Sequence, residues 1–399
     1  MKIIQREDYL KKMRALRDQN LIKILTGVRR CGKSTLLRMY RDELLTEKNM
    51  EKRVQYIDFE KPSNSYGATW KEIYDQISAS LVKNKMNYIF LDEVQYIDNF
   101  EKLLVGLQND EFVDLYVTGS NAHMLSSELA TLLSGRSFEI KVLPLSFNEY
   151  LELVDDSSRR VDEHFQDYLS FGGFPQAAIM PSSDPVFIDT YLSGIYETIV
   201  GRDIMDRGLV NDKSALNSVV RFLLDNIGSS VSVNSIADAL NLPREKIDKI
   251  MEALTASFLF YPVSRYDIKG KELLKSQKKY YAVDTGLKWA LLGRDASIDS
   301  GRILENIVYL ELLRRGNKIT IGKVGNQEMD FVARDSNGLT SYYQVSWTVG
   351  AAETLEREIA PFKKAADFNA RYLLTMDYGN FSHNGIRQLN IIEWLTGNF

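Results

Sequence analysis

Short apolar runs recur through the first part of the chain, and stretches with helical spacing separate most of them. A helix is predicted over residues 2–20, where Tyr9, Leu10, Met13 and Leu16 lie on one side. Five runs are typical of strands: Ile22–Thr26, Val54–Phe59, Tyr88–Leu91, Leu115–Thr118 and Phe138–Val142. Because strands that alternate with helices indicate a mostly parallel sheet between helical layers, residues 1–144 are predicted to form a three-layer α/β domain.

The hydrophobic pattern changes twice more along the chain. Over residues 145–210 strand-like runs disappear, and helical spacing with a Gly-Gly-Phe-Pro break at 172–175 predicts a helical, lid-like extension. Residues 211–284 have the predicted order helix, short strand, helix, helix and hairpin, which is the order of a winged helix. Residues 285–399 combine a long helix over Ile303–Leu313 with several strand-like runs, which predicts a second, small α/β domain.

Composition excludes several classes of protein. The chain has 399 residues, 44% hydrophobic and 26% charged, with a net charge of −4, so it can bury a core and is not a general polyanion binder. The single cysteine, Cys31, excludes a disulfide framework, and three histidines far apart in sequence (His123, His164 and His383) argue against a His-rich metal site. Without an apolar run long enough to span a membrane, or the apolar core of a signal peptide, we expect a cytoplasmic protein with no membrane partner.

A glycine-rich turn follows the first predicted strand. Residues 27–34 satisfy the pattern G-x-x-x-x-G-K-[ST] between a strand and a helix, the context that a phosphate-binding (P-loop) motif requires. Lys33 would reach the β- and γ-phosphates of ATP, and the Ser34 hydroxyl would bind Mg²⁺. Arg29 and Arg30 either touch phosphate or are exposed, with exposure favoured, and Cys31 fills the loop rather than acting as a nucleophile. The predicted ATP-binding residues are Gly27, Val28, Arg29, Arg30, Cys31, Gly32, Lys33, Ser34 and Thr35.

The third predicted strand ends in two carboxylates, Asp92 and Glu93. Beside a phosphate loop, Asp92 suits the Walker-B role of holding Mg²⁺, and Glu93 can polarise the attacking water as a general base. The fourth strand ends in Ser120 and Asn121, whose side chains can orient water between the acidic strand and the γ-phosphate. The alternative for these two residues is a turn that caps a helix over residues 122–125.

Arg136 precedes the fifth predicted strand. An arginine at this place can act in trans on the γ-phosphate bound by a neighbouring subunit of a homo-oligomer. A solvated or ion-paired arginine is the alternative, since sequence alone shows no interface.

Together these segments resemble a known group. GVRRCGKSTLL, YIFLDEVQ, VTGSN and LSGR are similar to the AAA+-type P-loop ATPase domain of prokaryotic proteins that carry a C-terminal DUF4143 region. FGGFP, Tyr196 and Arg202-Asp203-Ile204 resemble the segments that follow in that family, and ENIVYLELLRRG, QEMDFVA and YYQVSW resemble its C-terminal region. The resemblance implies an ATP-binding and ATP-hydrolysing protein in which Lys33, Ser34, Asp92 and Glu93 keep their roles. It leaves the subtype open, because Arg202 is the one candidate for a second sensor arginine, and a switch-type signalling ATPase is a related possibility.

Two further segments suggest what the ATPase acts on. The stretch Arg265–Lys279 contains six basic residues against Asp267 and Glu272, so a basic hairpin tip can contact DNA or RNA phosphates. The preceding helix, over Pro243–Ser257, has mixed charge and does not form a clean recognition face. A solvated loop or a winged helix used for protein contact is the alternative.

The C-terminal domain has the layout of a PD-(D/E)xK nuclease core. Glu305 on a helix, Asp330 on a strand and Gln344 on the next strand follow that order. The chemistry needs two carboxylates on Mg²⁺ and a lysine near the scissile phosphate. Gln344 stands where the second acid is expected and Ser346 where the lysine is expected, so we predict a nuclease-like fold without cleavage.

Three function classes follow from these patterns. The first is a remodelling ATPase that hydrolyses Mg-ATP to drive a conformational change, coupled to nucleic acid. The second is a nucleotide-gated switch acting on a protein partner. The third is an ATP-dependent nuclease-like effector, which the missing lysine disfavours.

Overall fold

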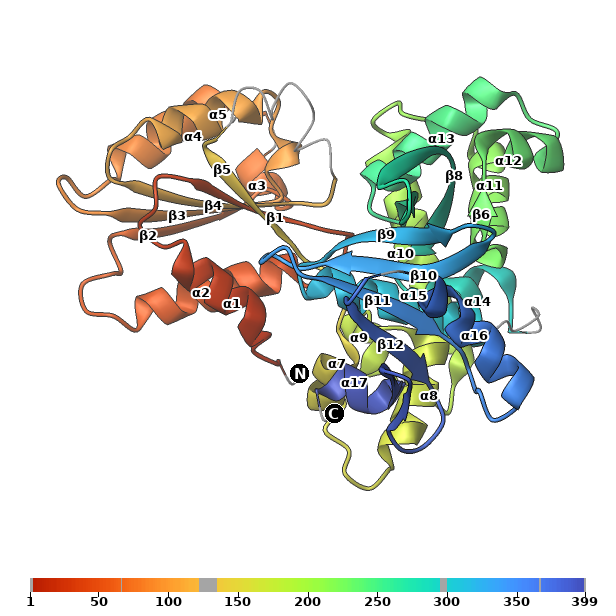
Figure 1. The fold of residues 1–399 in the computed structure, drawn as a ribbon. Helices are drawn as coiled ribbons and strands as arrows, with labels where there is room; N and C mark the ends of the chain where they lie inside the picture. Colours follow the sequence, from red (N-terminus) through yellow and green to blue (C-terminus); the bar gives the residue numbers. More distant parts are fainter. Residues whose placement is uncertain (1–2, 66, 122–134, 295–299, 366, 398–399) are drawn as a thin grey trace. The chain divides into compact units, whose positions relative to one another are not determined.

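The computed structural model describes residues 3–65, 67–121, 135–294, 300–365 and 367–397. They form two compact units (Figure 1). The first comprises residues 1–142 with Ala256–Phe258, and the second comprises Leu143–Thr255 with residues 259–399. No helix among the described residues is long and apolar enough to cross a membrane.

The first unit is built on a five-stranded sheet in the order β2-β3-β4-β1-β5, and every pairing in it is parallel. This confirms the predicted α/β P-loop ATPase fold. The strands are β1 (Ile22–Thr26), β2 (Val54–Asp58), β3 (Asn87–Asp92), β4 (Val113–Gly119) and β5 (Ser137–Lys141). The helices are α1 (Glu7–Ala15), α2 (Lys33–Leu45), α3 (Pro62–Ser65), α4 (Trp70–Ala79) and α5 (Phe100–Gln108), with a 3₁₀ turn over Val94–Tyr96.

Helices cover both faces of this sheet, with α1 and α2 on one side and α4 and α5 on the other (Figure 1). Successive side chains of a strand point to opposite faces, which explains the continuous apolar runs. Ile89 and Leu91 therefore pack in the core with residues of α4 and α5. Phe90 faces the other way and stacks on Tyr116, with ring centres 5.1 Å apart, beside Tyr40 of α2.

The first helix is shorter than the predicted 2–20 and spans Glu7–Ala15. Arg6 adopts a left-handed backbone conformation, with φ of 41°, which ends the helical path before Glu7. Asp18, with φ of 59°, turns the chain toward β1.

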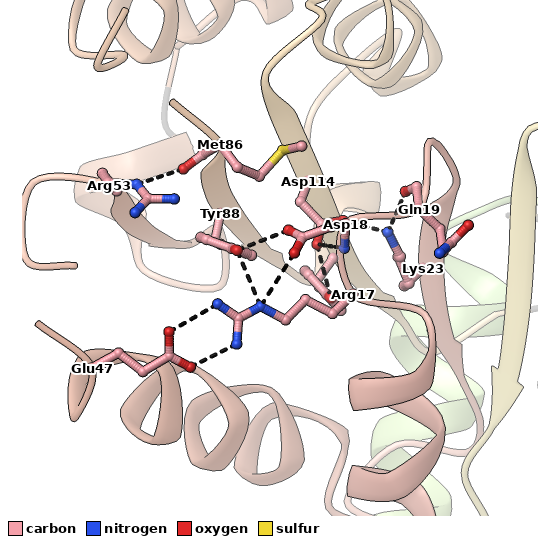
Figure 2. A network of polar contacts seen from close by, with 10 residues as sticks. Arg17, Asp18, Gln19, Lys23, Glu47, Arg53, Met86, Tyr88 and Asp114 are labelled. Atoms are coloured by element: carbon pink, nitrogen blue, oxygen red, sulfur yellow. Dashed lines mark hydrogen bonds and ion pairs between the residues drawn. The ribbon is translucent and has the colours of Figure 1, made fainter. Parts of the chain in front are cut away.

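A network of charged and polar residues occupies the amino end of this sheet (Figure 2). Lys23 and Asp114, each the second residue of its strand, form a fully buried ion pair, and Lys23 Nζ also donates to Gln19 O at 2.7 Å. Burial lowers the pKa of Lys23 and raises the pKa of Asp114, each against the influence of the other's charge. Arg17 joins the network to Glu47, two residues after the end of α2, with a nitrogen–oxygen distance of 2.6 Å. The loop expected to bind phosphate leaves the opposite, carboxyl end of β1.

The second unit contains helices followed by a nine-stranded sheet in the order β13-β14-β12-β11-β10-β9-β7-β8-β6. Its first part comprises α7 (Phe147–Val154), α8 (Val161–Phe171), α9 (Pro175–Ala178), α10 (Pro185–Thr198), a π-helix (Ile199–Met205), α11 (Lys213–Asp225), β6 (Ser230–Val231), α12 (Val233–Leu240), α13 (Arg244–Ala256), β7 (Phe260–Asp267), β8 (Glu272–Ala282) and α14 (Gly286–Leu292). The remaining elements are α15 (Ser300–Arg314), β9 (Lys318–Val324), β10 (Gln327–Arg334), β11 (Thr340–Val345), α16 (Ala352–Lys364), β12 (Ala370–Thr375), β13 (Phe381–His383), β14 (Ile386–Asn390) and α17 (Ile391–Thr396).

One sheet joins the hairpin of β7 and β8 to the C-terminal strands, because Arg265–Asp267 pairs in parallel with Ile321–Lys323. The expected boundaries at 210/211 and 284/285 therefore lie inside one compact unit, whereas the expected boundary at 144/145 lies two residues from a unit boundary. The sequence analysis did not predict β13, β14 and α17, which are short.

Asp284 explains the Gly-Gly break after α8. Its carboxylate accepts hydrogen bonds from the backbone N–H groups of Gly173, at 2.6 Å, and Gly286, at 2.9 Å. Gly172 has φ of +76°, and a Cβ there would lie 1.8 Å from Asp284 Oδ1, so only glycine fits. Burial raises the pKa of Asp284 to about 7.

Candidate nucleotide site

The predicted phosphate loop connects β1 to α2, and glycines shape both of its ends. A Cβ on Gly27 would lie 2.0 Å from Val142 O, and Gly32 has φ of +104°, so both positions require glycine. Helix α2 begins at Lys33 directly after the loop. The loop therefore leads into a helix N-terminus, where unpaired N–H groups and the helix dipole attract phosphate oxygens.

Lys33 is buried, and its ammonium group is held inside the loop. Nζ donates to Gly27 O at 3.0 Å and to Val28 O at 3.1 Å, and it lies 3.8 Å from Glu93 Oε1. Two of these partners are neutral carbonyls and the third is a distant ion pair. Lys33 can therefore exchange them for phosphate oxygens at small electrostatic cost.

Asp92, the last residue of β3, accepts three hydroxyl hydrogen bonds. Ser34 Oγ donates to Oδ1 at 3.0 Å, Thr118 Oγ1 donates to Oδ1 at 2.5 Å, and Tyr56 OH donates to Oδ2 at 2.6 Å. Burial raises the pKa of Asp92, and the hydrogen bonds from Thr118 and Tyr56 offset only part of that rise. The predicted pair of Ser34 and Asp92 is therefore brought together. Thr118 and Tyr56, which the sequence analysis did not single out, fix the carboxylate.

Glu93 is buried next to Asp92 and has a left-handed backbone, with φ of 55°. Its backbone N–H donates to Thr118 Oγ1 at 2.8 Å, and its carboxylate accepts a hydrogen bond from the Gln95 amide, which also reaches Ser120 Oγ at 3.3 Å. Burial acts to raise the pKa of the Glu93 carboxyl, but the charges of Lys33 and Arg29 outweigh it and hold that pKa below its ordinary value. Glu93 is therefore ionised at neutral pH, as a general base must be.

Two arginines, one in the loop and one outside it, make contacts that the sequence analysis did not predict. Arg29 was expected to be exposed, but it is buried, with Nη1 3.6 Å from Glu60 Oε1 and 3.4 Å from Tyr96 OH. Arg6 Nη1 donates to Cys31 O at 3.0 Å, and its guanidinium stacks on Tyr9, 4.6 Å from the ring centre. No local sequence pattern points to Arg6, because its loop partner Cys31 lies 25 positions further along the chain.

The remaining loop residues differ in their exposure. Arg30 is exposed, Val28 and Cys31 are buried, and Thr35 is half-buried in α2. Cys31 Sγ donates to Val142 O at 3.3 Å, and burial raises the pKa of its thiol, which fits a filling role.

Ser120 and Asn121 are buried at the carboxyl end of β4, beside the acidic strand. The alternative cap for a helix over residues 122–125 lies outside the described residues. Arg136 is exposed at the amino end of β5, where its carbonyl accepts a hydrogen bond from Ile22 N at 2.8 Å. Because β5 rises about 13 Å over its length, Arg136 lies far from the loop of its own chain.

The predicted basic hairpin tip differs from its expected form. Lys279 is not at the surface: its Nζ lies 2.9 Å from Glu305 Oε1 and 2.8 Å from Glu328 Oε1. Lys269, Lys271 and Lys278 are exposed, as predicted. The side chain of Lys275 lies outside the described residues. Arg202, the candidate second sensor, lies in the π-helix of the second unit.

The three residues of the nuclease-like layout do lie together. Gln344 Oε1 accepts a hydrogen bond from Asp330 N at 3.3 Å, and Lys279 Nζ lies between Glu305 and Asp330, 4.0 Å from Asp330 Oδ1. Gln344 Nε2 donates to Glu358 Oε2 at 3.0 Å, and Ser346 Oγ donates to Thr348 O at 3.2 Å. Burial, followed by the charge of Glu305, raises the pKa of Asp330 well above its ordinary value.

Among the described residues, no three His, Cys, Asp or Glu side chains form a group that could hold a metal ion by themselves. Ser34 and Asp92 supply two neighbouring oxygen ligands instead. This set fits Mg²⁺, which commonly binds through one or two protein ligands, substrate phosphates and water.

Comparison with known proteins gives two family matches. The family described as "AAA domain" matches residues 19–151, and a domain of unknown function, DUF8612, matches residues 162–298. The DUF4143 region implied by the sequence resemblance is not among these matches, so it stays a prediction. An uncharacterized protein of Haemophilus influenzae is 37% identical over 98% of this chain and 98% of its own length. Uncharacterized protein MJ1544 of Methanocaldococcus jannaschii is 28% identical over 87% of this chain and 79% of its own length.

Among solved structures, the RuvB Holliday junction branch migration motor of Thermotoga maritima aligns with 65% of this chain and 89% of its own, at 18% identity and a TM-score of 0.35. That likeness is too distant to support a functional argument.

Proposed function

The chain belongs to the same family as the Haemophilus influenzae relative, and from that premise and its AAA domain we propose that it binds Mg-ATP and hydrolyses it to ADP and phosphate. The observation that carries the proposal is the arrangement of Lys33. Its ammonium group lies inside the glycine loop on two carbonyl partners and 3.8 Å from Glu93.

The mechanism begins with an exchange at Lys33. When phosphate enters the loop, its oxygens replace Gly27 O, Val28 O and Glu93 as partners of Nζ. Glu93 loses a countercharge and faces the attacking water, from which it accepts a proton. Ser34 and Asp92 would hold Mg²⁺, which neutralises charge on the phosphates when bound. Thr118 and Tyr56 keep Asp92 oriented, while Gln95 and Ser120 position Glu93.

A nucleotide-gated switch is the second candidate, and the contacts of Glu93 favour it. In the described structure this carboxylate lies 3.8 Å from Lys33 Nζ and accepts a hydrogen bond from the Gln95 amide. Such a resting state predicts slow basal turnover and a change of conformation on ATP binding. Stimulation by a partner would then release Glu93.

In this proposal the second unit binds the nucleic acid or the partner on which the ATPase acts. We interpret residues 211–284 as a winged helix and residues 285–399 as a nuclease-like, DUF4143-type domain that binds DNA or RNA rather than cutting it.

A homo-oligomer would bring Arg136 to the γ-phosphate of a neighbouring subunit, since Arg136 lies at the end of β5 away from the phosphate loop of its own chain. A nuclease-like effector remains the weakest candidate, because Ser346 leaves the layout without its lysine.

Steady-state phosphate release tests the proposal directly. Purified protein with Mg²⁺ is assayed without nucleic acid, with single-stranded DNA and with duplex DNA. Glu93→Gln should keep ATP binding and lower turnover by about 100-fold or more, and Lys33→Ala should lose binding itself. DNA stimulation that both variants abolish favours a coupled ATPase, whereas slow turnover indifferent to DNA favours the switch.

Cys31→Ser is the matched control, since it changes only a buried side chain of the loop and leaves in place the backbone N–H groups that would bind phosphate. It should keep turnover within a few-fold of the unchanged protein. Undetectable binding of ATP by folded protein in the presence of Mg²⁺ would overturn the proposal.

A further inference from the structure

The second unit contains a polar cavity of about 670 Å³. Every described residue that lines it is a glycine or has a polar or charged side chain, so an apolar ligand would not fit its chemistry. Its charged lining residues come from five elements: Arg265 of β7, Lys279 of β8, Arg302 and Glu305 of α15, Lys323 of β9 and Glu328 of β10. Cations outnumber carboxylates, which makes the cavity suited to an anion.

The carboxylates of this cavity are already neutralised. Glu305 Oε1 accepts from Lys279 Nζ at 2.9 Å and from Tyr281 OH at 2.5 Å. Glu328 lies 2.8 Å from Lys279 Nζ and 3.6 Å from Arg265 Nη2. Lys279 is engaged by these ion pairs, and the other cationic side chains that line the cavity are Arg265, Arg302 and Lys323.

Within the part of the chain that the structure describes, three lining residues have buried polar atoms without a hydrogen-bond partner. They are Arg265 Nε, Ser229 Oγ and Gln327 Oε1. A buried polar atom that has lost water and gained no partner lowers the stability of the fold by about 1–3 kcal/mol, so native proteins contain few such atoms. That three such atoms line one cavity indicates that a polar ligand completes their hydrogen bonds. Two of the three, on Arg265 and Ser229, are able to donate.

We propose that this cavity binds the phosphate group of a phosphate ester, with Arg265, Arg302 and Lys323 as its cationic contacts. A planar guanidinium presents paired N–H groups that match two phosphate oxygens, and a lysine adds a point charge for the third. The Ser229 hydroxyl supplies a neutral donor. This phosphate comes from a nucleic-acid backbone or from a mononucleotide, and the inference holds whether or not the first unit hydrolyses ATP.

The same cavity holds the phosphate without cutting it. Lys279 Nζ lies 2.9 Å from Glu305, 2.8 Å from Glu328 and 4.0 Å from Asp330, so an ammonium group occupies the point at which these carboxylates would share a metal ion. Binding should therefore need no divalent cation, and DNA should stay intact with Mg²⁺.

The test uses full-length Lys33→Ala protein, which removes nucleotide binding at the first unit. Anisotropy of a fluorescein-labelled 20-nucleotide oligo(dT) and of a labelled duplex is measured in EDTA over a range of salt concentrations, with AMP as competitor. Arg302→Ala and Lys323→Ala should each weaken binding about fivefold or more. Each should also lower the slope of log affinity against log salt by about 0.7 to 0.9, the change expected for one lost phosphate contact.

Lys318→Ala is the matched control, because Lys318 is exposed on the same strand as Lys323 and does not line the cavity. It should leave affinity and salt slope unchanged, and Lys323→Arg should keep binding. Competition by AMP assigns the site to a mononucleotide, and its absence assigns it to nucleic acid. Equal loss in Lys318→Ala, no loss in the two cavity variants, or no binding by the parent protein would each overturn the proposal.

Discussion

Two buried lysines, one in each unit, lie among carboxylates but differ in what holds them. Lys33 is 3% exposed and Lys279 is 4% exposed. Lys33 donates to two backbone carbonyls and lies 3.8 Å from one carboxylate, whereas Lys279 has carboxylate oxygens at 2.8 Å and 2.9 Å. A cation held by neutral carbonyls can exchange them for phosphate, but a cation already neutralised by ion pairs cannot. We therefore expect similar residue types to give a phosphate-binding group in one unit and a structural group in the other.

The pKa values of two acids near these lysines, Glu93 and Asp330, are shifted in opposite directions. In the first unit Lys33 and Arg29 hold the pKa of Glu93 below its ordinary value, so the carboxylate stays ionised. In the second unit burial and the charge of Glu305 raise the pKa of Asp330, so this acid holds its proton to higher pH. For Lys279, burial acts to lower the pKa, but the charges of Glu305 and Asp330 outweigh it and raise that pKa.

Replacing each lysine by methionine should separate the two roles, and the largest effect falls on Lys279. Lys279→Met leaves buried carboxylates without a countercharge, which should lower the free energy of unfolding by about 3–5 kcal/mol. Urea denaturation followed by tryptophan fluorescence measures this, because Trp289, Trp347 and Trp394 all belong to the second unit. ATP affinity of the protein that remains folded should be unchanged.

Lys278→Met is the control, since Lys278 is the exposed neighbour on the same strand. It should change stability by less than about 0.5 kcal/mol. If Lys279→Met matched this control, the ion pairs of Lys279 would not be the structural element that the comparison requires.

Lys33→Met should produce the opposite outcome, a functional loss with a smaller loss of stability. Removing the ammonium would take away the proposed phosphate contact, which should strengthen as charge develops, so turnover should fall by about 100–1,000-fold. Phosphate release and ATP titration measure this effect. A drop in stability as large as that of Lys279→Met would contradict the distinction between the two lysines.

Much of the first unit follows from sequence because its signals are local. The strand, the glycines, Lys33 and Ser34 are contiguous, and Asp92 and Glu93 end an apolar strand at the same edge of a parallel sheet. Tyr56 and Arg6 could not be found this way, since their contacts depend on how distant segments pack.

The second unit shows more clearly which contacts cannot be predicted from the sequence. A charge count over Arg265–Lys279 includes Lys279, but alternation along β8 turns that side chain inward, and only the paired strands bring Glu305 and Glu328 to it. The continuous sheet through β7 and β9 is likewise a long-range pairing.

A pH titration of stability tests the contrast between Glu93, whose pKa is lowered, and Asp330, whose pKa is raised. Asp330 has a folded-state pKa above its ordinary value of 3.8, so the folded protein binds its proton more tightly than the unfolded chain. Its stabilising contribution is present at low pH and is lost as pH rises toward the folded pKa. Asp330→Asn stays neutral and should therefore gain stability relative to the unchanged protein as pH rises above about 4, by at most about 1.4 kcal/mol per pH unit. A pH-independent difference in urea denaturation would contradict this assignment.

The smallest expected effects come from two tyrosine hydroxyls that occupy corresponding places. Tyr56 OH donates to Asp92 at 2.6 Å in the first unit, and Tyr281 OH donates to Glu305 at 2.5 Å in the second. A buried hydrogen bond to a charged acceptor contributes about 1.5–3 kcal/mol, but Tyr56 is half-buried, so water can replace its hydroxyl and its loss should cost less than this range. Tyr56→Phe should raise the Mg²⁺ concentration needed for half-maximal ATP turnover by about tenfold, with little change in stability. Tyr281→Phe should instead lower stability by about 2 kcal/mol and leave the Mg²⁺ dependence unchanged. If both substitutions changed the Mg²⁺ dependence, or both changed only the stability, the clusters around Asp92 and Glu305 would be equivalent. The proposed difference between a site that exchanges its partners for a ligand and a site that keeps them would then be wrong.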